Sequence, residues 1–205
     1  MKKRKNTIEA PMGETKVLLH TCCAPCSSAI IEALLQNGIT PVIYYCNPNI
    51  YPREEYEIRK DECTRYAQAL GLEIVDADYD HENWIEAMAG LEAEPERGGR
   101  CLKCFKLRLL RTAAYARDHG FKVITTTLAS SRWKSLDQIN EAGLWACNEI
   151  NMIPPNMIPP DDRVIWWNQN WRKNGLQERR LEIIKQYDFY NQQYCGCEFS
   201  MRNKD

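Results

Sequence analysis

The sequence predicts an α/β fold, a Rossmann-like parallel sheet flanked by helices, with a helical C-terminal segment. Short runs rich in β-branched and aromatic residues alternate with longer stretches of helical spacing over residues 16–128. Glycine, alone or as Asn37-Gly38, closes most of the helical stretches. Because parallel strands all end at one edge of such a sheet, we expect a ligand site at that edge.

Four segments are predicted as strands because each is short and apolar and is bounded by turn residues. They are Lys16–Thr21, Pro41–Cys46, Glu73–Ala77 and Lys122–Leu128.

The predicted helices show helical spacing of apolar residues or good helix-forming composition. They cover Ser27–Gln36, Glu54–Leu70, His81–Ala89, Cys104–His119 and Gly175–Tyr187.

The chain is expected to form one domain over residues 16–200, preceded by a flexible arm (1–15) and followed by a disordered tail (201–205). A tandem copy, NMIPP at 151–155 and again at 156–160, places four prolines in ten residues. Prolines at that density exclude a regular helix or a central strand, so this segment is predicted as an exposed loop.

Composition indicates a soluble protein, with 27% charged and 44% hydrophobic residues and a net charge of -1. No apolar run is long enough to span a membrane, and the basic N-terminus lacks a signal-peptide core. We therefore expect a cytoplasmic protein. In that compartment thiols stay reduced, so ten cysteines favour metal or redox chemistry over structural disulfides.

Seven of the ten cysteines lie in three tight clusters. The clusters are Cys22-Cys23-Ala24-Pro25-Cys26, Cys101-Leu102-Lys103-Cys104 and Cys195-Gly196-Cys197. Thiolates at such short spacing bind soft metals or iron–sulfur clusters, or pair with one another.

The first two clusters could together complete a four-thiolate site. Cys22 and Cys23 follow a predicted strand directly, and Cys101 and Cys104 enter a helix, where the N–H groups and the helix dipole stabilise thiolate. Cys26 is a geometric alternative to one of the adjacent pair. Zinc and iron–sulfur clusters both accept four thiolates, so ligand type alone does not separate them.

Cys195-Gly196-Cys197 points to redox chemistry, because a disulfide across one intervening residue is a strained ring and is readily reduced. The alternative is that these two thiolates bind a second metal. Cys63 and Cys147 are interpreted as buried thiols without a site role, Cys46 is undecided, and His20 is interpreted as a hydrogen-bonded strand histidine.

A second, weaker signal is aromatic and basic. Trp166, Trp167 and Trp171 precede Arg172-Lys173, an arrangement that could stack bases and bind phosphates, although such residues also pack ordinary surfaces. The chain contains no P-loop, no Gly-x-Gly-x-x-Gly and no Ser/His/Asp signature.

Several motifs, in order over about residues 16–200, resemble those of the cobalamin-independent epoxyqueuosine reductase family (QueH). The matching residues are Leu18–Ser27, Asn47–Ile50, Pro52, Glu55-Tyr56, Arg59, Arg100–Phe105, Arg108-Leu109, Thr125–Leu128 and Gln193–Ser200. The chain departs from the family where Tyr51 stands in place of a common histidine and Arg132 follows Ser131 in place of proline.

The resemblance implies a Rossmann-like enzyme that removes the epoxide oxygen of epoxyqueuosine at the tRNA wobble position, the last step of queuosine biosynthesis. It implies that Cys22, Cys23, Cys101 and Cys104 hold a [4Fe–4S] cluster and that Cys195 and Cys197 form a redox-active disulfide pair. An additional iron ion is also implied, with Cys26 and the thiolates of Cys195 and Cys197 as candidate ligands. The partners would be tRNA carrying epoxyqueuosine and an electron donor.

The alternative reading is a zinc-containing RNA-binding module, in which the same thiolates are structural and the Trp166–Lys173 segment contacts RNA. A tRNA sulfurtransferase is a poorer match, because Cys22–Ser27 is not the phosphate loop that such an enzyme would carry after its first strand.

Overall fold

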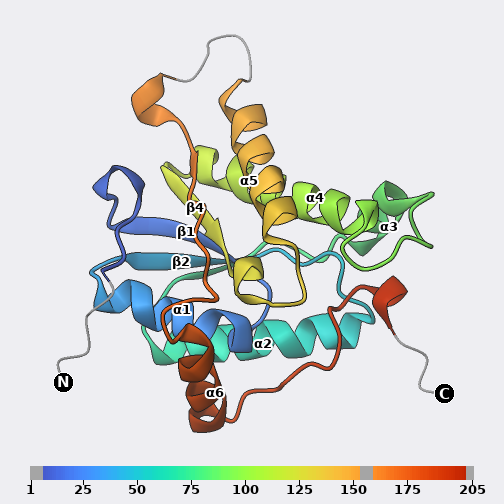
Figure 1. Cartoon of the computed structure of the whole chain (residues 1–205), viewed down its shortest axis with the longest axis horizontal. Helices are drawn as coiled ribbons and strands as arrows, with labels where there is room; N and C mark the ends of the chain where they lie inside the picture. Colours follow the sequence, from blue (N-terminus) through green and yellow to red (C-terminus); the bar gives the residue numbers. More distant parts are fainter. Residues whose placement is uncertain (1–6, 153–158, 202–205) are drawn as a thin grey trace.

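The computed structural model describes residues 7–152 and 159–201 and has the predicted α/β architecture (Figure 1). Five strands form one parallel sheet in the order β3-β2-β1-β4-β5. Their bounds are β1 Lys16–Thr21, β2 Thr40–Tyr45, β3 Ile74–Asp76, β4 Val123–Thr126 and β5 Ile165–Trp166.

Helices cover both faces of this sheet, with α1, α2 and α6 on one side and α3, α4 and α5 on the other (Figure 1). Their bounds are α1 Ala24–Gln36, α2 Arg53–Ala69, α3 His81–Met88, α4 Gly99–Asp118, α5 Leu136–Asn151 and α6 Leu176–Tyr187. Short 3₁₀ turns occupy Pro11–Gly13 (η1), Thr127–Ser130 (η2), Pro160–Asp162 (η3) and Glu198–Ser200 (η4).

The strand order creates a reversal point beside β1. From β1 the chain builds outward through β2 to β3, then returns to place β4 on the other side of β1. The connections that leave the carboxyl ends of β1 and β4 therefore diverge toward opposite faces of the sheet. They leave a crevice of the kind in which open α/β sheets bind ligands.

The central strands are buried on both faces, which explains why they read as continuous apolar runs and not as alternating patterns. Val17, Leu18 and Leu19 are fully buried, as are Val123 and Ile124 on the neighbouring strand. This double burial fixes the position of the residues that directly follow β1 and β4.

Helix α4 begins at Gly99, five residues before the predicted start at Cys104. Gly98 is the N-cap of this helix, and Gly99 is already helical. Helix α1 likewise begins at Ala24 and not at Ser27, because Pro25 lies in the first turn, where its missing N–H costs nothing.

Two elements were not predicted. Helix α5 follows Ser135, whose Oγ accepts a hydrogen bond from the Gln138 N–H at 3.3 Å as an N-cap. Strand β5 has only two residues and a weak pattern of its own. It pairs with β4, where Trp167 N–H donates to the carbonyl of Ile124.

Of the predicted N-terminal arm, residues 1–6 lie outside the described range, and Ile8 and Ala10 are buried against the core. Most of the duplicated NMIPP segment (153–158) and residues 202–205 of the predicted tail also lie outside it. The division into arm, domain and tail stays a prediction. Within the described residues, no helix is both long and apolar enough to cross a membrane.

The contact between α5 and β5 generates a testable prediction. A Cβ added at Gly143 of α5 would lie 2.2 Å from Cδ2 of the buried Trp166 ring. Gly143→Ala should therefore destabilise the protein by about 1–3 kcal/mol through overpacking, although the same exchange in an open helix stabilises it by about 1 kcal/mol. Denaturant unfolding measures the difference. The exposed neighbour supplies the control, Leu144→Ala, which should change stability by no more than about 0.5 kcal/mol. A Gly143→Ala variant at least as stable as the parent would contradict this packing.

Candidate metal and dithiol site

A cavity of about 1290 Å³ opens at the carboxyl ends of β1 and β4. Six of the seven clustered cysteines line it: Cys22, Cys26, Cys101, Cys104, Cys195 and Cys197. The seventh, Cys23, lies beside Cys22, with 3.9 Å between the two sulfurs. The fold thus gathers all three cysteine clusters around one space, at the sheet edge where the sequence predicted a site.

The first cluster forms the tightest group. Cys22 follows β1, Cys23 is the extended N-cap of α1 (φ -171°, ψ 159°), and Cys26 lies in the first turn of that helix. The three sulfurs all lie within 4.8 Å of one another. A group of three thiols at this spacing can bind a metal ion.

Hydrogen bonding concentrates negative charge on one sulfur of this group. Hydrogen bonds from the Cys23 and Cys26 thiols lower the pKa of Cys22 well below its usual value. The Thr127 hydroxyl adds a donor at 3.4 Å from that sulfur and also accepts from the Cys22 N–H at 3.1 Å. Burial raises the pKa of Cys23, and the hydrogen bond with Cys22 raises the pKa of Cys26 to about 11.

The second cluster lies on α4, across the cavity. Cys101 is in the first turn of the helix and Cys104 is one turn later, so both sulfurs lie on one side. The Arg97 N–H donates to the Cys101 sulfur at 3.3 Å. Burial raises the pKa of both thiols. These two sulfurs lie outside the 4.8 Å group formed by the first cluster.

The third cluster passes close to the loop after β2. Gly196 has a φ of +107°, which favours glycine, and an added Cβ would lie 2.9 Å from Ile50 Cγ1 and 3.0 Å from Arg59 Nη1. The Tyr51 N–H donates to the Gly196 carbonyl at 2.8 Å. Glycine is therefore required between the two cysteines both by conformation and by space. Cys195 and Cys197 are free thiols in this structure.

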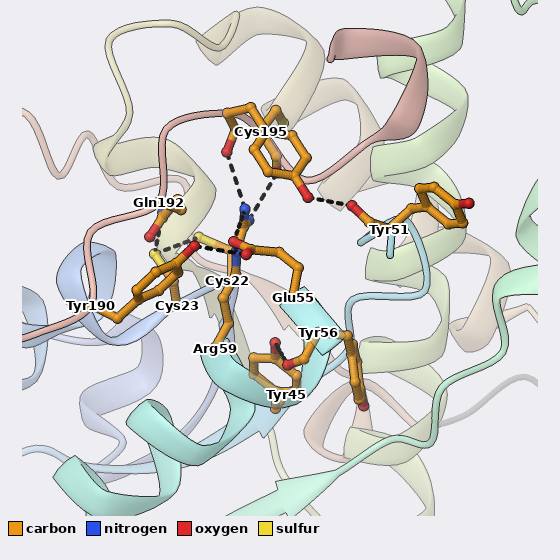
Figure 2. Close-up of polar contacts among 11 residues, drawn as sticks. Cys22, Cys23, Tyr45, Tyr51, Glu55, Tyr56, Arg59, Tyr190, Gln192 and Cys195 are labelled. Carbon is orange, nitrogen blue, oxygen red and sulfur yellow. Dashed lines mark hydrogen bonds and ion pairs between the residues drawn. The ribbon is translucent and has the colours of Figure 1, made fainter. Parts of the chain in front are cut away.

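A buried ion pair on α2 supports the same segment (Figure 2). Arg59 donates to Glu55 at 2.7 Å and, through its two terminal nitrogens, to the carbonyls of Tyr194 and Cys195 at 3.3 Å each. The Tyr190 hydroxyl donates to the other oxygen of Glu55 at 2.7 Å. We name these three side chains, Arg59, Glu55 and Tyr190, the clasp. They fix the backbone that leads into Cys195.

Two further contacts connect the clusters. Gln192 Nε2 donates to the Cys23 sulfur at 2.9 Å, which ties the C-terminal segment to the first cluster (Figure 2). Burial alone would lower the pKa of the Lys134 ammonium, but the sulfurs of Cys195, Cys22 and Cys26 together raise it. Lys134 thus adds a positive charge where the first and third clusters meet.

The cavity wall is strongly basic, with eight basic residues and the single acidic residue Glu96 among the residues that line it. The basic residues are Arg59, Arg97, Arg100, Arg108, Arg132, Lys134, Arg172 and Arg180. Arg108 is buried, and its guanidinium donates to the carbonyl of Cys46 and the side-chain oxygen of Asn47. Such a wall suits an anionic substrate.

The structure also shows where the other cysteines and His20 lie. Cys63 and Cys147 are buried and do not line the cavity, as expected. The prediction for His20 is confirmed, because its ring nitrogens contact Thr126 Oγ1 at 2.7 Å and the Cys46 carbonyl at 3.1 Å, and burial lowers its pKa to about 3. Cys46 is buried and contributes its carbonyl to the site.

The aromatic RNA-stacking interpretation of residues 166–173 was wrong. Trp166, Trp167 and Trp171 are all buried in the core, where Trp167 and Trp171 pack edge to face. Sequence reasoning gave no site role to Thr127, Gln192 and Lys134. Only Thr127 carried a signal, since it follows β4 at the same sheet edge as Cys22.

Comparison with known proteins identifies the family of this chain. Residues 17–203 match the family model described as epoxyqueuosine reductase QueH. The protein called epoxyqueuosine reductase QueH in Haemophilus influenzae is 46% identical over 201 residues, covering 98% of this chain and 78% of that protein. Its namesake in Acinetobacter baylyi is 45% identical, covering 99% of this chain and 88% of that protein. A more distant namesake, in Thermotoga maritima, is 30% identical over 90% of each chain. This chain therefore belongs to the epoxyqueuosine reductase QueH family.

Proposed function

We propose that this chain is an oxidoreductase that converts epoxyqueuosine at the tRNA wobble position to queuosine. The reaction takes an epoxide, two electrons and two protons to an alkene and water. The observation that carries the proposal is the meeting of three cysteine clusters in one basic cavity, in a chain that matches named epoxyqueuosine reductases over nearly its whole length.

The donor set suits a soft metal or an iron–sulfur cluster, because seven thiols lie in or beside the cavity. We assign Cys22, Cys23, Cys101 and Cys104 as ligands of a [4Fe–4S] cluster and Cys26 as a ligand of an additional iron ion or as an alternative cluster ligand. When bound, the cluster would deliver electrons singly at low potential, and the additional iron would act as a Lewis acid.

The sulfur spacing bears on the role of Cys26. The 3.9 Å between the Cys22 and Cys23 sulfurs is close to the roughly 3.8 Å that two thiolates span on one tetrahedral ion with bonds of about 2.3 Å. Cys26 lies within the same group. This spacing fits an alternative to the assignment above, in which the three thiols of the first cysteine cluster hold a single ion. The [4Fe–4S] assignment instead depends on Cys101 and Cys104 from across the cavity.

The chain's own dithiol matches the stoichiometry of the reaction. Oxidation of the Cys195 and Cys197 thiols to a disulfide releases two electrons and two protons, the amounts that the epoxide consumes. The epoxide oxygen would leave as water, and an external donor would then reduce the disulfide. We expect this cycle in the cytoplasm, where thiols stay reduced.

The zinc-containing RNA-binding module is not favoured. Its RNA contact depended on Trp166, Trp167 and Trp171, which are buried. A structural zinc site also leaves the third dithiol without a role. Anaerobic purification separates the two, because iron–thiolate charge transfer produces a brown protein with broad absorption near ~400 nm and zinc produces a colourless one.

Three predictions test the proposed function, and the first concerns the reaction itself. Reconstituted, reduced protein should convert epoxyqueuosine in tRNA to queuosine, measured by nucleoside analysis of the digested tRNA. The same tRNA with oxidised, metal-free protein is the control. Unchanged epoxyqueuosine under reducing, metal-loaded conditions would overturn the proposal.

The second prediction concerns the dithiol. Cys195→Ser should abolish multiple turnover while the metal absorbance stays at the parent level, because serine cannot form the disulfide. Cys147→Ala is the matched control, since that thiol is buried outside the cavity and should leave turnover unchanged. Sustained turnover by Cys195→Ser would exclude the redox role.

The third prediction tests the clasp as a positioning device. Arg59→Met leaves the Glu55 carboxylate, whose side chain is 10% exposed, without its cationic partner and with only the Tyr190 hydroxyl as donor, and should cost about 3–5 kcal/mol of stability. The double variant Arg59→Met/Glu55→Gln should recover most of that loss, measured by denaturant unfolding. The double variant should still have a lower kcat than the parent with an unchanged KM, because the carbonyls of Tyr194 and Cys195 remain unanchored. A stable double variant with parent kcat would show that the ion pair serves stability alone.

A further inference from the structure

The loop between η2 and α5, residues 131–135, carries an exposed tryptophan at the mouth of the cavity. The Trp133 side chain is 63% exposed and lines the cavity together with its neighbours Arg132 and Lys134. The tryptophans at 84, 166, 167 and 171 are at most 7% exposed. Trp133 therefore does not serve the core, and it lines the same cavity as six of the cysteines.

The backbone of this loop is tied down. Arg97 Nε donates to the Trp133 carbonyl at 2.8 Å and its Nη2 donates to the Arg132 carbonyl at 3.0 Å. Arg172 Nη2 donates to the next carbonyl, that of Lys134, at 2.6 Å. Three successive carbonyls thus accept from two arginines of other segments. A ring carried on an anchored loop loses less conformational entropy when it binds a ligand.

Arg132 extends the aromatic surface. Its guanidinium carbon lies 4.8 Å from the centre of the Trp133 ring, a cation–π contact. A planar cation on an indole is the kind of surface on which a nucleobase stacks, and stacking tolerates any base because every base has a π-face.

The charge around the loop suits a polyanion. The arginines at 97, 100, 172 and 180 donate to backbone carbonyls, so their charge is not neutralised by those contacts. In the described part of the chain these four form no ion pair with a carboxylate. The wall therefore keeps net positive charge available for phosphates.

We propose that Trp133 is a stacking platform for a base of the tRNA anticodon loop next to the modified nucleoside, with Arg132 and the neighbouring arginines contacting the flanking phosphates. This inference rests on the proposed function. When the modified nucleoside enters the cavity, the adjoining base leaves its own stack at the rim, where Trp133 replaces that contact.

The binding test uses a synthetic RNA hairpin with the anticodon stem and loop. Trp133→Ala should weaken the Kd for the hairpin about 5- to 100-fold, and Trp133→Phe should recover part of that loss because phenylalanine still stacks. The dependence of log K on log salt should keep its slope in Trp133→Ala, which removes no charge, and should fall by about one in Arg132→Gln. Leu144→Ala, an exposed apolar change on the outer side of α5, is the control and should bind like the parent.

A double-mutant cycle identifies the stacked base. A hairpin with an abasic residue next to the wobble position should bind the parent as weakly as Trp133→Ala binds the intact hairpin. Combining both changes should cost little more than either one. Additive losses would overturn the stacking contact.

A further outcome would also overturn the inference: binding of the hairpin by Trp133→Ala with parent affinity. Because affinity is measured without turnover, the inference can fail while wild-type protein still produces queuosine. It can also hold if the parent leaves epoxyqueuosine unchanged.

Discussion

The site depends on the reversal of strand order between β1 and β4. Both strands are buried, so their last residues have fixed positions, and the chain segments that follow them diverge to opposite faces of the sheet. The Cys22 N–H donates to Thr127 Oγ1 at 3.1 Å, and this hydrogen bond joins the two segments directly after the strands. Cys23 and Cys26 then take their places because α1 starts immediately afterward. Without this reversal, a helix crossover would cover the place where the sulfurs meet.

Buried arginines hold the segments that carry the other two cysteine clusters beside this crevice. Arg108 is buried below Cys104 and binds the carbonyl of Cys46, which joins α4 to the end of β2. Arg59 is buried beside Glu55 and binds the carbonyls that precede Gly196. A buried guanidinium costs desolvation free energy and repays it only when its several donors are satisfied. Each of these two arginines therefore favours a single arrangement of the segments that it binds. A contact between apolar side chains is not directional and would specify that arrangement less strictly.

Much of this could be predicted from local sequence, and the part that could not has physical reasons. The first strand and a ligand site at the carboxyl edge of the sheet follow from apolar patterning and from the position of Cys22 after a strand. The start of α4 and the existence of α5 depend on caps at Gly98 and Ser135, which look like loop residues in isolation. Contacts such as Gln192 with Cys23 span 169 positions, and no local pattern encodes them. Sequence alone also did not distinguish buried tryptophans from the exposed one.

The net charge of the chain likewise does not show where its charged residues lie. The chain has 27 basic and 28 acidic residues, which by itself excludes no partner. Taking away the eight basic residues and one acidic residue that line the cavity leaves 19 basic and 27 acidic residues for the rest of the molecule. The charge is thus segregated, with a basic cavity in an acidic body. A polyanion is therefore attracted to the cavity more strongly than the net charge of the whole chain suggests. A nearly neutral chain can therefore select a nucleic acid by where its charge lies.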